Sequence, residues 1–357
     1  MRSPAPGIRG RGTAENPPNR FERFHVEPDP KACDEVGPSP ATQFFRDRSC
    51  SIISYNDSPD VGFAASVNPY RGCEHGCPYC YARPTHEYLG FSAGLEFETR
   101  IVVKPDAPEL LRQELASAQW QPQPVALSGV TDCYQPVERR LQLTRRCLQV
   151  LVQARNPVCV VTKNHLVTRD IDLLSQLAAY GAARVYLSLT TLDAALTARL
   201  EPRASLPAHR LAAISALRRA GVPVGVLVAP VIPGLNDHEI PALLQAAAQA
   251  GASFASYSLL RLPQPVATLF EAWLQRHFPL RKDKVLNQLC ALRGGRLDDP
   301  RFGFRMRGQG PGAERLAAWF ELARRRADLA SAPPELCVAG FRREVPADTR
   351  TQQPGLL

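Results

Sequence analysis

The sequence predicts an α/β protein with a parallel sheet, and three observations support this fold class. Between residues 65 and 260, short β-branched runs alternate with longer segments of helical periodicity. The length of 357 residues accommodates one α/β barrel, which takes roughly 200–250 residues, together with extensions. A hydrophobic content of 45% with 7% aromatic residues is typical of a soluble globular chain. We therefore expect one main domain with additions at its ends.

Six strands are expected, and each delivers its carboxyl end to a loop that can carry function. The first ends at Asn68, and the others span 125–129, 158–162, 184–190, 222–230 and 253–260. Helices are expected at 136–154, from Thr168 onward, and at 205–221, 236–251, 265–292 and 311–328. Thr168 and Ser205 are the expected N-caps. Repeated strand–helix–strand units require a parallel sheet with right-handed crossovers, but periodicity does not separate an open barrel from a doubly wound sheet.

A cysteine-rich loop follows the first strand. Cys73, Cys77 and Cys80 stand at Cys-x3-Cys-x2-Cys spacing, with Tyr79 just before the last thiol. Glycines and a proline in the loop permit tight turns, so three thiols can point at one object. Closely spaced thiolates are soft ligands, suited to an iron–sulfur cluster or to zinc.

An iron–sulfur cluster and a structural zinc ion differ in the number of protein ligands that they require. A structural zinc ion needs four ligands, so the fourth would be a histidine such as His75 or His86. A cubane iron–sulfur cluster held by three thiolates leaves one iron open to a substrate or cofactor. The spacing of the loop admits both.

The spacing of these cysteines, with Tyr79 before the third, resembles the signature of radical S-adenosylmethionine (radical SAM) enzymes. The resemblance implies a partial (β/α)6 barrel, a [4Fe-4S] cluster on Cys73, Cys77 and Cys80, and S-adenosylmethionine (SAM) at the open iron. It also implies an external one-electron donor such as flavodoxin or ferredoxin, reductive cleavage of SAM, and hydrogen abstraction from substrate by a 5′-deoxyadenosyl radical. The alternative is a nucleic-acid- or protein-binding module whose cysteine loop holds structural zinc.

The chain divides into an irregular N-terminal extension (1–50), a radical SAM core (51–295) and a C-terminal helical extension with a tail (296–357). The N-terminal extension combines Pro, Gly and Arg without apolar periodicity, which predicts an irregular backbone. Its segments 10–12 and 19–22 resemble the start of a bacterial subgroup of the family. We therefore expect this extension to pack on the core.

The resemblance assigns SAM contacts to the ends of the strands. The turn after 125–129 carries hydroxyls and a glycine where the family places the methionine amino group, although it departs from the family's Gly-Gly-Glu segment. These hydroxyls could instead only hold a turn that caps the next helix. Arg203 could clamp the SAM carboxylate or pair with Glu201. The expected cofactor contacts are Tyr79, Ser128, Gly129, Thr131, Ser188, Thr190, Arg203 and Val228.

Residues 50–295 most resemble the spore-photoproduct-lyase-like, DNA repair photolyase-related group, which implies work on nucleic acid. In a photoproduct lyase a hydrogen-donating cysteine precedes the Asp of the second-strand turn, whereas here Thr131 precedes Asp132. Cys133 is the candidate donor and Tyr134 the adjacent candidate catalytic residue; the alternative is that Cys133 is an incidental thiol. Radical modification of a protein or small metabolite is a second enzymatic alternative.

The net charge and the pattern of cysteines limit which binding partners and which cellular location can be expected. A formal charge of +9 permits attraction to nucleic acid and equally fits solvated basic segments. No apolar run approaches the ~20 residues of a membrane span. The remaining cysteines lack framework spacing, which predicts free thiols in a reducing compartment, and we expect a cytoplasmic protein without membrane contact. These cysteines are Cys33, Cys50, Cys133, Cys147, Cys159, Cys290 and Cys337.

Overall fold

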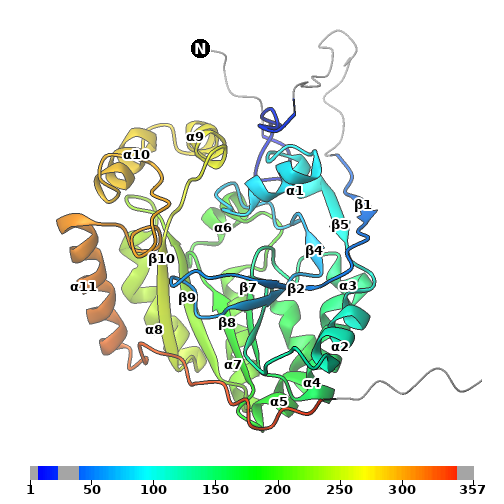
Figure 1. Ribbon diagram of the computed structural model, residues 1–357. Coiled ribbons are helices and arrows are strands. Elements are labelled where there is room, and N and C mark those ends of the chain that lie inside the picture. Colours follow the sequence, from blue (N-terminus) through cyan, green and yellow to red (C-terminus); the bar gives the residue numbers. More distant parts are fainter. Residues whose placement is uncertain (1–6, 23–39, 344–357) are drawn as a thin grey trace, which may run out of the picture.

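The computed structural model describes residues 7–22 and 40–343, and within them a seven-stranded sheet forms the core (Figure 1). The strand order is β10-β9-β8-β7-β6-β3-β2. The parallel strands are β3 (Ala65–Val67), β6 (Val125–Leu127), β7 (Val158–Thr162), β8 (Ala183–Ser188), β9 (Val224–Val231) and β10 (Phe254–Leu259). Strand β2 (Ile53–Tyr55) adds antiparallel to β3. The parallel strands match the six expected ones.

The order of the strands confirms the partial (β/α)6 barrel. Each parallel strand lies beside the next one in the sequence, whereas a doubly wound sheet reverses direction at a switch point. Strands β2 and β10 end the sheet, so the barrel is open between them. The parallel strands are mostly buried on both faces, as expected of strands covered by crossover helices.

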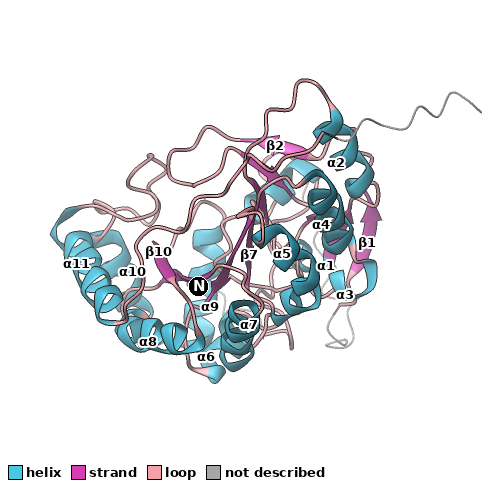
Figure 2. Cartoon of the chain, turned by 90° about the horizontal axis from the view of Figure 1, so that it is seen from below, coloured by secondary structure: helices cyan, strands magenta, loops and turns pink. Residues whose placement is uncertain are grey.

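Helices cover the outside of this sheet in an arc (Figure 2). The helices of the barrel are α2 (Ala107–Ala116), α4 (Leu143–Ala154), α5 (Ile171–Ala178), α6 (Ala194–Leu200), α7 (Pro207–Arg219) and α8 (Ile240–Ala250). Shorter helical turns are η1 (Arg83–Leu89), α1 (Glu96–Thr99), α3 (Glu138–Leu141), η2 (His165–Asp170) and η3 (Asp237–Glu239). The buried positions of α4 and α5 are mainly leucine and valine on one face of each helix, which explains why they pack on the sheet.

Both expected N-caps are wrong. Asn164 caps the turn η2 by accepting a hydrogen bond from the backbone N–H of Leu166, and the Thr168 hydroxyl donates to the carbonyl of His165 instead. The Ser205 hydroxyl accepts from the backbone N–H of His165, so it joins two loops rather than capping α7. Tertiary contacts between the two loops use the polar groups that the local rule assigns to caps.

Two predicted helices are interrupted. The segment expected at 136–154 forms α3 and α4, separated at Gln142, whose φ is 52°. The segment expected at 265–292 forms α9 (Val266–His277) and α10 (Lys282–Ala291). The last helix, α11 (Gly310–Arg326), packs against α8, as the contacts between the two helices show.

A second, smaller sheet joins the N-terminal extension to the core. Its order is β1 (Gln43–Arg46), β5 (Arg100–Val103) and β4 (Tyr70–Arg71), with β1 parallel to β5. Strand β1 lies in the stretch for which the sequence predicts an irregular backbone. Its pairing partner β5 is more than 50 residues away along the chain, and such a partner leaves no local signal.

In the part of the chain that the structure describes, no helix is long and apolar enough to cross a membrane. The cysteines at 50, 73, 77, 80, 133, 147, 159, 290 and 337 are all free thiols. Cys33, which we also expect to be free, lies outside the described residues.

Candidate active site

The cysteine loop crosses the carboxyl end of the barrel after β3 and is held by its own backbone. The backbone N–H of Cys73 donates to the carbonyl of Phe97, at 2.9 Å, and that of Cys80 to the carbonyl of Cys77, at 3.2 Å. Gly76 has a φ of 72°, which L-residues rarely adopt, so a glycine is required at this turn. The loop is thereby wrapped with its thiols turned inward and largely buried.

The three thiols lie close enough to affect one another. Burial raises the pKa of Cys73 well above its usual value, and Asp132 and the other two thiols raise it further. Burial also raises the pKa of Cys77 and Cys80, while the positive charge of Lys163 acts in the opposite direction on both. Binding of iron requires the thiolates, so a nearby cation favours the ligand form.

These residues fit an iron–sulfur cluster. Three free thiols that act on one another's pKa, two of them buried and Cys80 partly buried, are the soft ligands that would hold such a cluster, and they would leave one iron without a protein ligand from the loop. Among residues 7–22 and 40–343, no group of three or more His, Cys, Asp or Glu side chains is arranged to hold a single metal ion.

Of the two histidines considered as a fourth zinc ligand, His75 has other polar partners, and both ring nitrogens of His86 are buried without a hydrogen-bond partner among the described residues. His75 Nδ1 lies 3.4 Å from an oxygen of Asp132, and its Nε2 lies 3.3 Å from the amide nitrogen of Asn164. The buried ring of His86 packs against Phe91 and Phe97, and burial lowers its pKa to about 4. No observation favours the zinc alternative.

A buried ion pair between Arg83 and Glu98 holds the backbone of the cysteine loop. Arg83 Nη2 lies 2.6 Å from Glu98 Oε1, both side chains are fully buried, and Arg83 Nε donates to the carbonyl of Cys77 at 2.9 Å. The guanidinium therefore ties the loop backbone to a carboxylate that is itself fixed. Loss of either partner leaves an uncompensated buried charge.

The N-terminal extension completes this support, as expected from its sequence. Glu98 accepts hydrogen bonds from the backbone N–H groups of Gly12 and Thr13, at 3.0 and 3.1 Å. A Cβ added at Gly12 would lie 1.6 Å from the carbonyl oxygen of Gly76, so only glycine allows the two backbones to approach this closely. Asn19 also donates to the carbonyl of Glu87, at 2.8 Å. The extension therefore packs directly on the cysteine loop.

Glu201 is the centre of a buried polar cluster beside the cysteines. Its carboxylate accepts hydrogen bonds from the hydroxyls of Tyr79 and Thr190 and forms ion pairs with Arg210 and Lys163. Burial by itself would raise the pKa of Glu201, but the charges of Arg210 and Lys163 hold it well below the usual range of a carboxyl group. The carboxylate is thus charged and fixes Tyr79 and Lys163 next to the thiols.

Asp132 joins three loops at the same end of the barrel. Its carboxylate accepts from the hydroxyl of Thr162 and from the backbone N–H of Lys163, both at 2.8 Å, and it faces His75 of the cysteine loop. The turn after β6, the turn after β7 and the cysteine loop are therefore mutually positioned by one side chain.

The turn after β6 is held mainly by its own polar groups. Ser128, with a φ of 81°, accepts from the backbone N–H of Cys133 at 2.8 Å, and the Thr131 hydroxyl donates to the carbonyl of Tyr70 at 2.9 Å. The carbonyl of Gly129 accepts from the hydroxyl of Tyr81, at 3.1 Å. The two hydroxyls expected to contact SAM thus hold the turn in this structure.

The remaining predicted contacts, at positions 188, 203 and 228, lie in different local environments. The carbonyl of Ser188 accepts from Arg210, and Val228 is a buried residue of β9. Arg203 Nη2 lies 3.1 Å from Glu74 Oε1. Within the described chain, Arg203 and Glu201 each pair with other residues, so the alternative of a pair between them is wrong.

The two candidate catalytic residues lie in the core. Cys133 is 1% exposed, and burial raises the pKa of its thiol well above the usual value. The hydroxyl of Tyr134 donates to Asp170 at 3.0 Å, within a buried ion-pair network that includes Arg145 and Arg169. The structure therefore engages Tyr134 with this network rather than with the cysteine loop.

Sequence analysis missed the roles of Glu201, Arg210 and His75. Glu201 was weighed only as a partner for Arg203, and Arg210 lies in the first turns of an ordinary helix. The only indication of this cluster in the sequence is that the polar segments 162–164 and 201–203 end or follow parallel strands. Which cation reaches Glu201 depends on the packing of α7, so the sequence carries no indication of it.

Comparison with known proteins defines the class of this protein. A sequence model described as "Radical SAM superfamily" matches residues 67–247, half of the chain. The chain therefore belongs to the radical SAM superfamily, whose enzymes use a [4Fe-4S] cluster and SAM.

The relatives of this chain have names that state no activity. The chain is 39% identical over 219 residues to uncharacterized protein Mb2609c of Mycobacterium bovis, a match that covers 61% of this chain and 64% of the relative. It is 28% identical over 173 residues to uncharacterized protein MJ0683 of Methanocaldococcus jannaschii, with coverage of 48% and 62%. The match thus spans a little less than two thirds of these relatives.

Solved structures show the same fold. Spore photoproduct lyase complexed with dinucleoside spore photoproduct has a TM-score of 0.53 at 18% identity, covering 80% of this chain and 77% of that one. A variant of the same enzyme with bound AdoMet and dinucleoside spore photoproduct has a TM-score of 0.52 at 19% identity, with the same coverage. These likenesses establish the fold of the barrel.

Proposed function

We propose that this protein is an enzyme that cleaves SAM reductively and abstracts a hydrogen atom from its substrate. The observation that carries this proposal is the set of three free, neighbouring thiols, buried or partly buried, in the loop that follows the first parallel strand of an open barrel. In α/β barrels the loops at this end carry the active site.

The chain's own residues would hold the cofactors. Cys73, Cys77 and Cys80 are the cluster ligands, and the cluster, when bound, supplies the electron that breaks the C5′–S bond of SAM to give a 5′-deoxyadenosyl radical. Burial of the thiols and the charges of Lys163 and Arg83 beside them set the electrostatic environment of the cluster.

For SAM, we propose the carboxyl ends of β6, β8 and β9 as the binding surface. In this proposal the turn 128–131 faces the amino group of SAM, and a move of Arg203 from Glu74 to the SAM carboxylate would supply a charged hydrogen bond. Thr190, two residues after β8, and Val228, within β9, are the proposed contacts for ribose and adenine. Lys163, only partly buried and already fixed by Glu201, is a further candidate contact.

We propose nucleic acid as the substrate class and a repair-like reaction as the activity. The support is the formal charge of +9 and the shared fold with spore photoproduct lyase, whose solved complex contains a dinucleoside photoproduct. The external electron donor, such as flavodoxin or ferredoxin, and a cytoplasmic location belong to the same proposal. Cys133 as hydrogen donor is part of the proposal only if its buried thiol becomes accessible to substrate.

The test is anaerobic reconstitution with iron and sulfide, followed by dithionite reduction in the presence of SAM and chromatography of 5′-deoxyadenosine. Wild type should release 5′-deoxyadenosine, and Cys77→Ala should not. Cys147→Ala is the matched control, because Cys147 is an equally buried thiol on α4, outside the cysteine loop, and should retain activity. A wild-type protein that loads iron and binds SAM without cleaving it, with or without oligonucleotide, would refute the proposal. Transfer of deuterium from a perdeuterated oligothymidylate to 5′-deoxyadenosine would identify nucleic acid as substrate.

A further inference from the structure

Two neighbouring arginines near the cysteine loop have no acidic partner among the residues that the structure describes. Arg293 is 1% exposed, and its Nη2 donates to the carbonyls of Leu260 and Arg305, at 2.5 and 3.0 Å. Its Nε and Nη1 are buried without any hydrogen-bond partner. The Nε of Arg261 is also buried without a partner, and its Nη1 only approaches the sulfur of Met306, at 3.9 Å.

The two positive charges act on each other. Burial lowers the pKa of Arg293, the carboxylate of Asp298 opposes this effect, and the charge of Arg261 lowers the pKa further. Burial likewise lowers the pKa of Arg261, and Arg305 adds to this effect. Asp298 does not neutralise the pair through a hydrogen bond, since one of its carboxylate oxygens is itself buried without a partner. Asp299 and Asp60 also act on this pair, but they are bound to Arg301 and Arg305, so four arginines face three carboxylates and an excess of positive charge remains.

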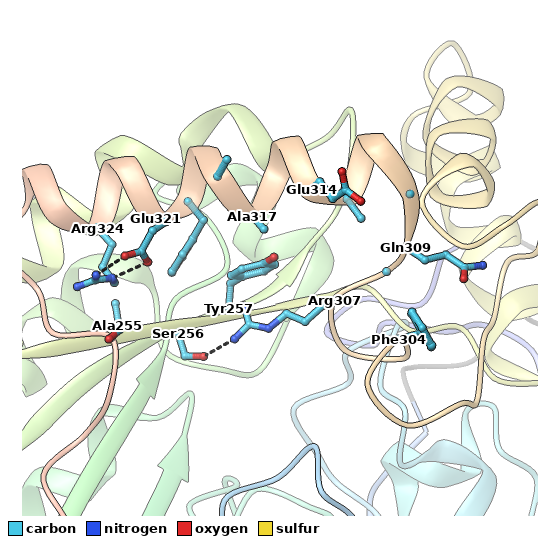
Figure 3. A pocket seen from close by; sticks show the side chains of 16 residues that line it. Ala255, Ser256, Tyr257, Phe304, Arg307, Gln309, Glu314, Ala317, Glu321 and Arg324 are labelled. Atoms are coloured by element: carbon cyan, nitrogen blue, oxygen red, sulfur yellow. Dashed lines mark hydrogen bonds and ion pairs between the residues drawn. The ribbon is translucent and has the colours of Figure 1, made fainter.

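Two nearby arginines, in contrast, each form an ion pair with an aspartate. Arg305 Nε lies 2.5 Å from Asp60, and Arg301 Nη2 lies 2.7 Å from Asp299. Figure 3 shows the groove between β10 and α11, where Arg324 is paired with Glu321 and Arg307 donates to the hydroxyl of Ser256. Arg324 thus has an acidic partner and Arg307 a hydroxyl partner, whereas Arg261 and Arg293 have no ion pair within the described chain and keep buried N–H groups without a hydrogen-bond partner. An uncompensated buried charge is costly unless an anion binds.

The position of Arg261 places the excess charge beside the reactive centre. Arg261 follows β10 by two residues, at the same end of the barrel as the cysteine loop. Its guanidinium carbon lies 5.6 Å from the centre of the ring of Tyr81, the residue directly after Cys80. The hydroxyl of Tyr81 in turn donates to Gly129 of the turn after β6. A group bound at Arg261 would therefore lie next to both the cysteines and the turn.

We propose that Arg261 and Arg293 form a subsite for a phosphate group of the substrate, a proposal that rests on the function proposed above. Arg261 is the residue that contacts the phosphate, because it is the more exposed of the two. Arg293 is a positioning residue: it donates to the carbonyl of Leu260, the residue before Arg261, and to the carbonyl of Arg305, and it adds its charge. The phosphate belongs either to a small nucleotide or to the backbone of a nucleic acid.

The subsite is tested by binding to the reconstituted enzyme under anaerobic conditions without reductant. The probe is a fluorescein-labelled oligothymidylate, followed by fluorescence anisotropy over a range of salt concentrations, with orthophosphate and thymidine 5′-monophosphate as competitors. The variants are Arg261→Gln and, as the matched control, Arg296→Gln, which removes an exposed arginine three residues after Arg293. Arg261→Lys and the melting temperature of each variant separate loss of contact from misfolding.

We expect Arg261→Gln to weaken binding by about tenfold or more, as for a lost charged hydrogen bond. The slope of log affinity against log salt should fall by about 0.7, the value for one phosphate contact on a single strand. Arg296→Gln should change affinity much less, and Arg261→Lys should retain the slope. Displacement of the probe by thymidine 5′-monophosphate at concentrations as low as those of unlabelled oligothymidylate identifies a small nucleotide as the source.

Equal binding of every probe by Arg261→Gln and Arg296→Gln would overturn the subsite. This outcome is independent of the proposed function, because the binding assay needs no SAM cleavage. Arginine-dependent binding without release of 5′-deoxyadenosine would contradict the radical chemistry and leave the subsite standing.

Discussion

Substitution of Glu201 by Gln provides a stringent test of the buried cluster beside the cysteines. The side chain of Glu201 is 1% exposed and pairs with Arg210, also 1% exposed, and with the less buried Lys163. Gln keeps the shape of the side chain but removes its charge, and so leaves Arg210 buried without a counter-charge. Breaking such a pair from one side costs about 3–5 kcal/mol of unfolding free energy.

The assay is urea unfolding of the reconstituted protein, followed by far-UV circular dichroism. The control is Glu109→Gln, because Glu109 pairs with Arg112 on the surface of α2 with its side chain 56% exposed, and such pairs contribute about 0.2–1 kcal/mol. The double variant Glu201→Gln/Arg210→Met removes both charges and should lose less than the sum of the single losses. A loss below about 1 kcal/mol for Glu201→Gln, or strict additivity in the double variant, would refute the reasoning.

Three further outcomes are expected. The fold lowers the pKa of Glu201, so the contribution of its charge to stability is complete above the pKa of an unfolded glutamate, about 4.3, and is lost as pH falls through the lower folded-state pKa. The difference in unfolding free energy between wild type and Glu201→Gln should therefore close below about pH 4 in acid titrations. A constant difference would contradict this. Gly12→Ala should displace the N-terminal extension from Gly76 and accelerate loss of iron to a chelator, whereas Gly62→Ala, whose added Cβ would lie 4.0 Å from its nearest neighbour, should not, so equal rates would exclude a role of this contact. Cys133→Ala should retain iron fully, since its thiol lies in the core, and unchanged product distribution in turnover would remove it as hydrogen donor.

The sequence predicted the barrel and the cysteine loop because both depend on local signals. The β-branched runs at 158–162 and 222–230 became β7 and β9, and the spacing of the cysteines in the loop is sufficient to bring three thiols together. The packing of segment 10–12 on the loop followed from a resemblance, and the structure supplies its physical cause in Glu98.

The partners of polar side chains could not be predicted in the same way. Ser205 has the residue type of an N-cap, but its hydroxyl binds the backbone of His165, which is 40 residues away. Arg203 and Arg210 are equivalent as cations in the sequence near Glu201, and the packing of α7 decides that Arg210 forms the pair. Such choices depend on distances between loops that come together only in the folded barrel.

The central claim is that Cys73, Cys77 and Cys80 together hold one cluster. The most direct measurement is the content of iron and acid-labile sulfide in anaerobically reconstituted wild type and in the three single alanine variants, with Cys147→Ala as control. We expect about four irons and four sulfides per chain in wild type and in Cys147→Ala, and loss of both in each loop variant. Stoichiometric zinc without sulfide, or an intact cluster in Cys77→Ala, would contradict the claim.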